Sequence, residues 1–251
     1  LPLFTADHQG SAARYVEQRI RASGGVPARQ VVVNAFGQGA AGDMSSGLTR
    51  SGPAWADEVG RHEGRAMLRA WTLAGRRLDP RLSLDSRWTR YCMCGQVTSA
   101  GRVDSRAVIG VAASAGSEEL RTAFNEALVG EEGRRLPVPV GPQGHKVPGL
   151  DVTDGVPTVL PGSLVRIGDR LVATLPGEPT IAAGDLLRRS LLPIVRPAGV
   201  RRVVVVGYAG EYVSYITEPN EYDRQHYEGG FTLFGRAEVA VMRDQMMMLA
   251  R

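Results

Sequence analysis

The sequence predicts a mixed α/β (α+β) protein with a β-sheet core flanked by helices. Its 251 residues are 43% apolar and 22% charged, enough to bury a sizeable core. Short β-branched runs occur between segments whose apolar residues recur at helical spacing, and the two kinds follow one another in irregular order. The chain contains no internal repeat and no low-complexity segment.

In the first third, residues 12–23 have a helical apolar face that ends at Gly24 and Gly25. Residues 31–36 (VVVNAF) predict a short buried strand, which is followed by a loop of small residues, 37–47. Apolar residues at helical spacing predict a long helix over 55–74.

The middle of the chain is less regular. Alternation predicts a strand over 88–97, and residues 108–115 are small and apolar. A helix is expected over 117–129, and the Gly- and Pro-rich residues 131–157 indicate a long connection.

The last third has the clearest pattern. Residues 163–167 and 171–175 predict a strand pair that turns at Gly168 and Asp169, and a helix follows over 180–192. The unbroken β-branched run 200–206 predicts a central strand. Residues 236–249 predict a helix whose methionines fill the core or an interface.

Charge excludes some partners. The net charge of +4 comes almost entirely from arginine, because Lys146 is the single lysine. The basic residues are scattered and form no stripe for nucleic acid, although weak attraction to an anionic membrane surface is allowed. No stretch approaches the ~20 apolar residues that cross a bilayer.

Cys92 and Cys94 are too close in sequence for an ordinary mutual disulfide and indicate small residues on a strand.

Two places could carry chemistry on residue type alone. Ser45 lies in a glycine-rich loop after an apolar run, where glycines let the backbone approach a substrate; a turn or helix cap is the alternative. Glu178 lies on a Pro-Gly turn between a strand and a helix, where an acid that interacts with the helix dipole is the alternative.

A third place is the segment 208–227, which holds five tyrosines in a chain with 6% aromatic residues. Polar and acidic residues separate them, so the pattern is not that of a core. A tyrosine suits a position that needs an apolar body and a polar tip. A tyrosine-rich surface loop is the alternative. The tyrosines are Tyr208, Tyr212, Tyr215, Tyr222 and Tyr227.

Three separated motifs, in order, resemble the neutral/alkaline non-lysosomal ceramidase family. The first is residues 36–45 (FGQGAAGDMS), and the second is residues 175–184 (LPGEPTIAAG). The third joins residues 211–222 (EYVSYITEPNEY) to residues 225–235 (QHYEGGFTLFG). The chain departs from the family's pattern at Ala40, Ser46 and Gly47, which leaves Ser45 in place.

The resemblance implies a role for four residues. Ser45 matches the family's nucleophile, and Glu178 and Tyr215 match ligands of its zinc ion. Tyr227 matches a tyrosine beside the scissile amide, where it would donate to the developing oxyanion. Tyr208, Tyr212 and Tyr222 are assigned to packing.

The family's zinc site also takes two histidines that precede the serine motif. His8 is out of register for that role, and the other three histidines are expected at the surface. We therefore expect an N-terminal segment or a second chain to supply them. The chain as a whole, residues 1–251, is expected to be one catalytic-domain fragment that lacks that segment and the family's C-terminal immunoglobulin-like domain.

The resemblance implies a zinc-dependent amidohydrolase of sphingolipid metabolism that cleaves the N-acyl linkage of ceramide to sphingosine and a fatty acid. It also implies a secreted or cell-surface hydrolase that meets its lipid at a membrane surface. The alternative is a non-catalytic homologue that acts as a lipid-binding or scaffolding module. Zinc content distinguishes the two.

Overall fold

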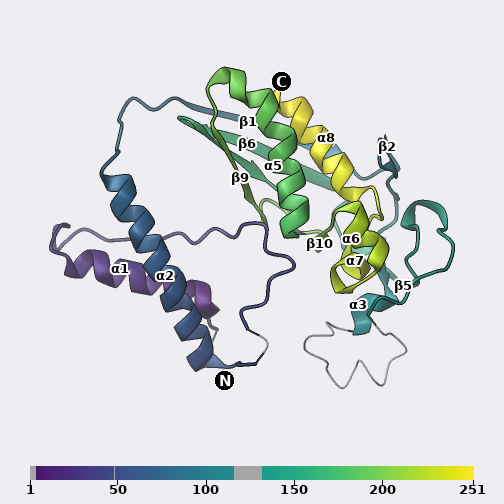
Figure 1. Cartoon of the computed structure of the whole chain (residues 1–251), viewed down its shortest axis with the longest axis horizontal. Coiled ribbons are helices and arrows are strands. Elements are labelled where there is room, and N and C mark those ends of the chain that lie inside the picture. The colour runs from purple at the N-terminus through teal and green to yellow at the C-terminus, as the bar shows by residue number, and fades with distance from the viewer. Residues whose placement is uncertain (1–3, 48, 116–131) are drawn as a thin grey trace. The chain divides into compact units, whose positions relative to one another are not determined.

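A computed structural model describes residues 4–47, 49–115 and 132–251 (Figure 1). Contacts divide the chain into two units. A helical unit comprises residues 1–37 and 45–81, and a sheet unit comprises residues 38–44 and 82–251. The helix expected over 117–129 lies outside the described residues.

The helical unit consists of α1 (Asp7–Ala22) and α2 (Pro53–Gly75), which confirms both predicted helices. The two helices pack closely at Gly60 and Gly64 of α2. A Cβ atom on Gly60 would lie 2.4 Å from the His8 carbonyl oxygen, so the contact requires glycine.

The strand predicted over residues 31–36 is wrong. These residues belong to no strand, and the side chains of Val31 and Val33 are 72% and 77% exposed. A β-branched run favours an extended backbone, but a strand also needs a neighbouring strand to receive its hydrogen bonds. The described part of the chain offers none there.

The sheet unit is built on four strands in the order β1-β6-β7-β9. The pairs β1–β6 and β6–β7 are antiparallel, whereas β7 and β9 are parallel and are connected through α5 (Figure 1). The bounds are β1 (Leu84–Cys92), β6 (Val159–Ile167), β7 (Arg170–Thr174), α5 (Ile181–Val195) and β9 (Arg202–Val206).

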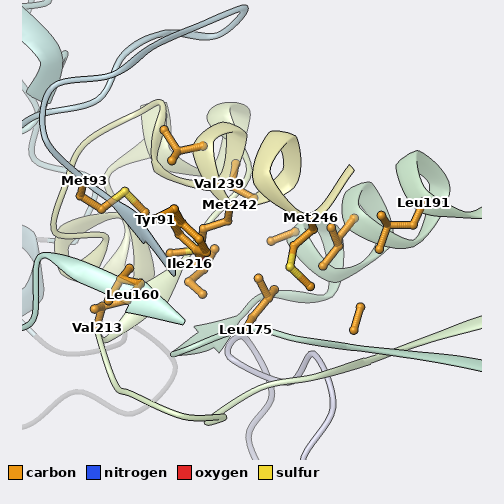
Figure 2. Packing of buried hydrophobic residues seen from close by; sticks show 14 of the residues in the cluster. Tyr91, Met93, Leu160, Leu175, Leu191, Val213, Ile216, Val239, Met242 and Met246 are labelled. Atoms are coloured by element: carbon orange, nitrogen blue, oxygen red, sulfur yellow. The ribbon is translucent and has the colours of Figure 1, made fainter. Parts of the chain in front are cut away.

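Helices α5 and α8 (Glu238–Ala250) lie side by side over one face of this sheet (Figure 1). Helix α8 comes close to β6 at Gly162, where a Cβ atom would lie 2.8 Å from the Met246 sulfur. Figure 2 shows Met242 and Met246 packed among the core residues, which confirms the prediction for these two methionines, whereas Met248 is 55% exposed. The mixed α+β fold with a sheet core flanked by helices is therefore confirmed.

The hairpin predicted around Gly168 and the helices predicted over 180–192 and 236–249 are present. The strand predicted over 88–97 is shifted toward the N-terminus, because β1 covers Leu84–Cys92 and residues 93–96 lie in no strand. The run 200–206 does form a strand, β9, but the prediction that it is central is wrong. It lies at one edge of the described sheet, with Val204 44% exposed, because only β7 pairs with it.

Shorter elements complete the sheet unit. Two small antiparallel pairs and one small parallel pair flank the main sheet, and the tyrosine-rich segment forms two short helices. These elements are β2 (Val97–Thr98), β3 (Gly101–Arg102), β4 (Val108–Gly110), α3 (Val111–Ala115), η2 (Gly141–Gln143), β5 (Pro148–Asp151), η3 (Thr153–Gly155), β8 (Glu178–Pro179), η4 (Arg196–Ala198), β10 (Tyr215–Ile216), α6 (Pro219–Arg224) and α7 (Tyr227–Phe231).

Cys92 and Cys94 form a disulfide, contrary to the prediction from their spacing. Strand β1 ends at Cys92, and the Cα atoms of the two cysteines lie 5.2 Å apart, within the range that disulfides bridge. None of the described helices is both long enough and apolar enough to span a membrane.

Candidate active site

The candidate site lies where the two parallel strands of the main sheet end. Glu178 follows β7 across the turn Pro176–Gly177, and Tyr208 follows β9 after Gly207. Segments that leave the carboxyl ends of parallel strands diverge toward the helices, and this is where ligands bind in open α/β sheets.

Tyr215 lies directly opposite Glu178, because β8 and β10 pair in parallel with these two residues in register. The Glu178 amide donates to the Ser214 carbonyl over 2.8 Å. Gly177 makes this approach possible, since a Cβ atom there would lie 2.4 Å from the same carbonyl oxygen. The Pro-Gly-Glu sequence therefore brings the carboxylate and the phenol together through the backbone.

Both oxygens of Glu178 accept hydrogen bonds from tyrosines. The Tyr208 hydroxyl donates to Oε2 over 2.8 Å, and the Tyr212 hydroxyl donates to Oε1. The two tyrosine rings stack with centroids 6.1 Å apart and remain 46% and 50% exposed. The assignment of these two tyrosines to packing is therefore wrong, whereas Tyr222 is fully buried as that assignment requires.

Tyr227 comes to the same place from α7. Its ring meets the Tyr215 ring edge-on with centroids 5.4 Å apart, and Phe231 packs against both. Pro219 at the first position of α6 and a capping box between Glu218 and Glu221 fold the intervening chain. We call Glu178, Tyr208, Tyr212, Tyr215 and Tyr227 the tyrosine cluster.

The cluster keeps its phenols protonated. Burial raises the pKa values of Tyr208, Tyr212, Tyr215 and Tyr227, and the negative charge of Glu178 raises them further. Near neutral pH each phenol is therefore a hydrogen-bond donor, and Glu178 is the acceptor on which two of them converge.

Three non-glycine residues of the tyrosine-rich segment have a left-handed backbone; Gln225 ends α6, and the other two lie near Glu178. Tyr208 and Ser214 have φ angles of 54° and 68°, in the left-handed region that non-glycine residues seldom occupy. Such conformations cost about 1–3 kcal/mol each and concentrate at functional sites. The Tyr208 amide donates to the Gly177 carbonyl over 2.8 Å, which holds this conformation next to Glu178.

Part of the glycine-rich loop, residues 38–44, packs on the same turn. The Gly42 amide donates to the Pro179 carbonyl over 2.9 Å, and a Cβ atom on Gly42 would lie 2.5 Å from the Glu178 carbonyl oxygen. Asp43 Oδ1 accepts the Ile181 amide at the start of α5 over 2.8 Å. The hydrogen bonds of Gly42 and Asp43 thus hold residues 38–44 next to the turn that carries Glu178.

Ser45 is exposed, and it is the residue at which the helical unit resumes. Ser45 thus belongs to the helical unit, whereas the tyrosine cluster belongs to the sheet unit. Only Met44 separates Ser45 from the fastened Asp43. Of the four residues with predicted roles, the structure brings together Glu178, Tyr215 and Tyr227.

Three of the four histidines contact groups outside the tyrosine cluster. His8 pairs with Glu63 over 2.9 Å, His145 contacts the Leu136 carbonyl over 2.8 Å, and His226 lies 3.7 Å from Glu132. Among the described residues, no group of three His, Cys, Asp or Glu side chains could hold a metal ion. The donors that fit zinc are the Glu178 carboxylate and the Tyr215 phenol, which make up half of a tetrahedral set.

Comparison with known proteins shows the family to which the chain is related. A family model for the neutral/alkaline non-lysosomal ceramidase N-terminal region matches residues 142–244, which include the whole tyrosine cluster. A solved structure of a ceramidase complexed with C2 superimposes with a TM-score of 0.78 at 29% identity, over 99% of this chain and 42% of that one. The chain belongs to the neutral/alkaline ceramidase family.

Two relatives show how far the likeness extends. The neutral ceramidase of Pseudomonas aeruginosa is 33% identical over 264 residues, which is 93% of this chain and 38% of that protein. Its crystal structure superimposes with a TM-score of 0.74. The neutral ceramidase of Mycobacterium tuberculosis is 46% identical over 95 residues, or 38% of this chain and 15% of that protein. This ceramidase-family chain thus spans about two fifths of the Pseudomonas protein.

Proposed function

We propose that the chain carries part of the active site of a zinc-dependent amidohydrolase that cleaves the N-acyl bond of ceramide to sphingosine and a fatty acid. The tyrosine cluster is the observation that supports this most strongly. It places one carboxylate and four protonated phenols together at the carboxyl ends of parallel strands, in a chain similar to proteins named neutral ceramidases. An amide hydrolase needs such donors where its oxyanion develops.

Each residue of the proposed site would have its own role in the reaction. Ser45 supplies the hydroxyl that attacks the amide carbonyl carbon, or orients a water that does so. Tyr227 donates a hydrogen bond to the carbonyl oxygen as it becomes an oxyanion. If Ser45 attacks, its hydroxyl proton passes to the leaving nitrogen as the C–N bond breaks, sphingosine departs as the amine, and water then hydrolyses the Ser45 ester to release the fatty acid. If water attacks directly, its proton passes to the leaving nitrogen and the fatty acid forms in the same step.

Glu178 and Tyr215 would hold the zinc ion. Bound zinc supplies Lewis acidity, which polarises a carbonyl or a water oxygen. Glu178 would exchange one or both of its phenol hydrogen bonds for the metal, and the displaced Tyr208 and Tyr212 hydroxyls would then face the substrate. The other ligands would be two histidines from an N-terminal segment or from a second chain.

The helical unit suits contact with an anionic membrane surface. It holds eleven arginines against six carboxylates, so it carries more than the whole net charge of the chain. A groove of about 630 Å³ between α1 and α2 is lined by Arg14, Arg19, Arg61 and Arg65, with Asp57 as its one acidic residue. Clustered arginines attract acidic lipids. A secreted or cell-surface location would bring the groove to its lipid.

The alternative is a ceramidase homologue that binds lipid or acts as a scaffold without catalysis. The strain at Tyr208 and Ser214 favours the enzyme, because a scaffold gains nothing from strained residues beside a carboxylate.

The test uses the complete protein and a ceramide with a fluorescent acyl chain. We expect about one zinc per chain, and amide cleavage that a chelator abolishes and added zinc restores. Glu178→Gln keeps the size of the side chain and removes its charge, so it should lower zinc content and turnover together. Glu211→Gln, an exposed acid of the same segment, is the matched control and should change neither. Zinc-free protein that binds ceramide without cleaving it would support the scaffold instead.

A further inference from the structure

Lys146, the single lysine of the chain, is fully buried. Its ammonium group donates to two backbone carbonyls, that of Val108 over 2.8 Å and that of Thr232 over 2.6 Å. It also lies 5.3 Å from the centre of the Tyr222 ring. The side chain thus links β4 to the residue that follows α7.

Other buried polar residues bind the same stretch of backbone. Gln143 donates to the Leu233 carbonyl over 3.0 Å and to Asp104 over 3.2 Å, and Glu238 accepts the Phe234 amide over 2.8 Å. The Tyr222 hydroxyl donates to the Gln143 carbonyl over 2.8 Å. We call Asp104, Gln143, Lys146, Tyr222 and Glu238 the Lys146 network.

Helix α7 carries Tyr227 and rests on the lysine. Gly230 packs so tightly on α3 that a Cβ atom would lie 2.5 Å from the Ala113 nitrogen. A Cβ atom on Gly110 would meet both the Lys146 stem at 3.0 Å and Gly230 Cα at 3.2 Å. Thr232, which ends α7, is therefore fixed by the ammonium group on one side and by packing on the other.

Burying an ammonium group is unfavourable even when it is fully hydrogen-bonded. Well-packed apolar residues often stabilise such a position at least as well as a buried charge does. Stability alone is thus a weak reason for a lysine here. Its directed hydrogen bonds instead fix the end of α7 at one distance from β4, and so fix the Tyr227 ring against Tyr215.

We propose that Lys146 is a positioning residue for amide cleavage: by clamping the Thr232 and Val108 carbonyls it holds α7 so that the Tyr227 hydroxyl reaches the oxyanion. The inference rests on the proposed function. It adds a residue that does not touch the substrate and acts through Tyr227.

The first test measures steady-state kinetics of Lys146→Met in the complete protein. Methionine fills a similar space without the charge. Displacing a catalytic group by about 1 Å can lower the rate about 10²-fold, so we expect a fall in kcat of that order with KM and zinc content unchanged. The control is Leu191→Ala, a fully buried α5 residue about 15 Å along the helix from Ile181. It should lower Tm while leaving kcat near wild type.

A double-mutant cycle with Tyr227→Phe then asks whether the lysine acts through that tyrosine. Positioning predicts that Lys146→Met lowers kcat by less than about 3-fold once the Tyr227 hydroxyl is absent, because residues that act as a unit are not additive. A full additional loss in the double variant would overturn the proposal and leave Lys146 a structural residue.

Hydrogen exchange supplies a readout that needs no activity. In Lys146→Met the amides of residues 229–232 should exchange faster, while those of α5 remain as in wild type. Unchanged exchange in α7 would overturn the clamp. If the wild-type protein cleaved no amide, the proposed function would be wrong, and exchange alone would still decide whether Lys146 holds α7.

Discussion

The tyrosine cluster and the Lys146 network use the same kinds of residue in opposite ways. In the cluster, the Tyr208 and Tyr212 hydroxyls donate to a side chain, the Glu178 carboxylate, and both tyrosines are about half exposed. In the network, Tyr222 donates to a backbone carbonyl and Glu238 accepts a backbone amide, and both residues are fully buried.

The difference indicates which group of residues can change partners. Hydrogen bonds between exposed side chains can be exchanged for bonds to a metal or a substrate at little cost, because water stabilises the released groups. Bonds from buried side chains to the backbone cannot, since breaking them leaves polar groups without partners. We therefore expect substitutions in the cluster to change turnover more than stability, and substitutions in the network to change stability as well.

The largest effect is expected at Ser45, the residue that the resemblance assigns as the nucleophile. If Ser45 is the nucleophile, Ser45→Ala in the complete protein should lower kcat at least about 10³-fold. Because the residue is exposed, the free energy of unfolding should stay within about 0.5 kcal/mol of wild type. Turnover and melting temperature measured on one preparation decide this.

Ser46→Ala is the matched control, because Ser46 is exposed and its backbone carbonyl, which the substitution keeps, accepts the Trp55 indole N–H over 3.0 Å. It should retain full turnover. A Ser45→Ala protein that lost about 1 kcal/mol of stability and kept its turnover would show a loop cap in place of a nucleophile.

A smaller effect separates the two tyrosines whose rings meet. Tyr227→Phe should lower kcat about 10²-fold and leave zinc content unchanged, as expected for one lost oxyanion donor. Tyr215→Phe should weaken zinc binding, and added zinc should restore part of the activity. Metal analysis and kinetics on both variants check this. Full zinc and full activity in both would reduce the cluster to a surface feature of the fold.

The sequence predicted most of the fold where local and long-range preferences agree. The hairpin at Gly168 and the helices α1, α2, α5 and α8 follow from periodicity and from turn residues. Residues 31–36 and the strand β9 have similar β-branched patterns, and only β9 has a partner. Periodicity reports the preference of a segment but not whether neighbouring strands exist. The strand predicted at 31–36 is therefore absent, and the strand at 200–206 is present at an edge and not at the centre.

The site was predictable to the extent that it depends on motifs. The resemblance pointed to Glu178, Tyr215 and Tyr227, which the structure brings together. It missed Tyr208 and Tyr212, although their positions just after a β-branched strand and near a Pro-Gly-Glu turn were a usable signal. The burial of Lys146 was out of reach, because a lone lysine between a glycine-rich turn and a proline has the sequence context of a surface residue.

The last comparison distinguishes the network from the cluster by the pH dependence of stability. Burial raises the pKa of Glu238 to about 8, so the folded protein binds more protons than the unfolded chain between about pH 4.5 and 8. The stability from this group is complete below about pH 4.5 and is lost as pH rises toward 8. Glu238→Gln should remove this slope, which is at most about 1.4 kcal/mol per pH unit.

Lys146 should change the pH dependence of stability in the opposite direction. Burial lowers its pKa to about 7, so its contribution is complete above about pH 10.5 and is lost as pH falls toward 7. Lys146→Met should therefore flatten the alkaline side of the stability profile, and Glu238→Gln the acidic side. Tyr212→Phe should alter neither side below pH 9, because its phenol stays protonated there. Denaturant unfolding from pH 5 to 9 measures all three variants. If the free energy of unfolding depended on pH equally in the wild type and in both network variants, Lys146 and Glu238 would be hydrated in solution. The contrast between a buried network and a half-exposed cluster would then be wrong.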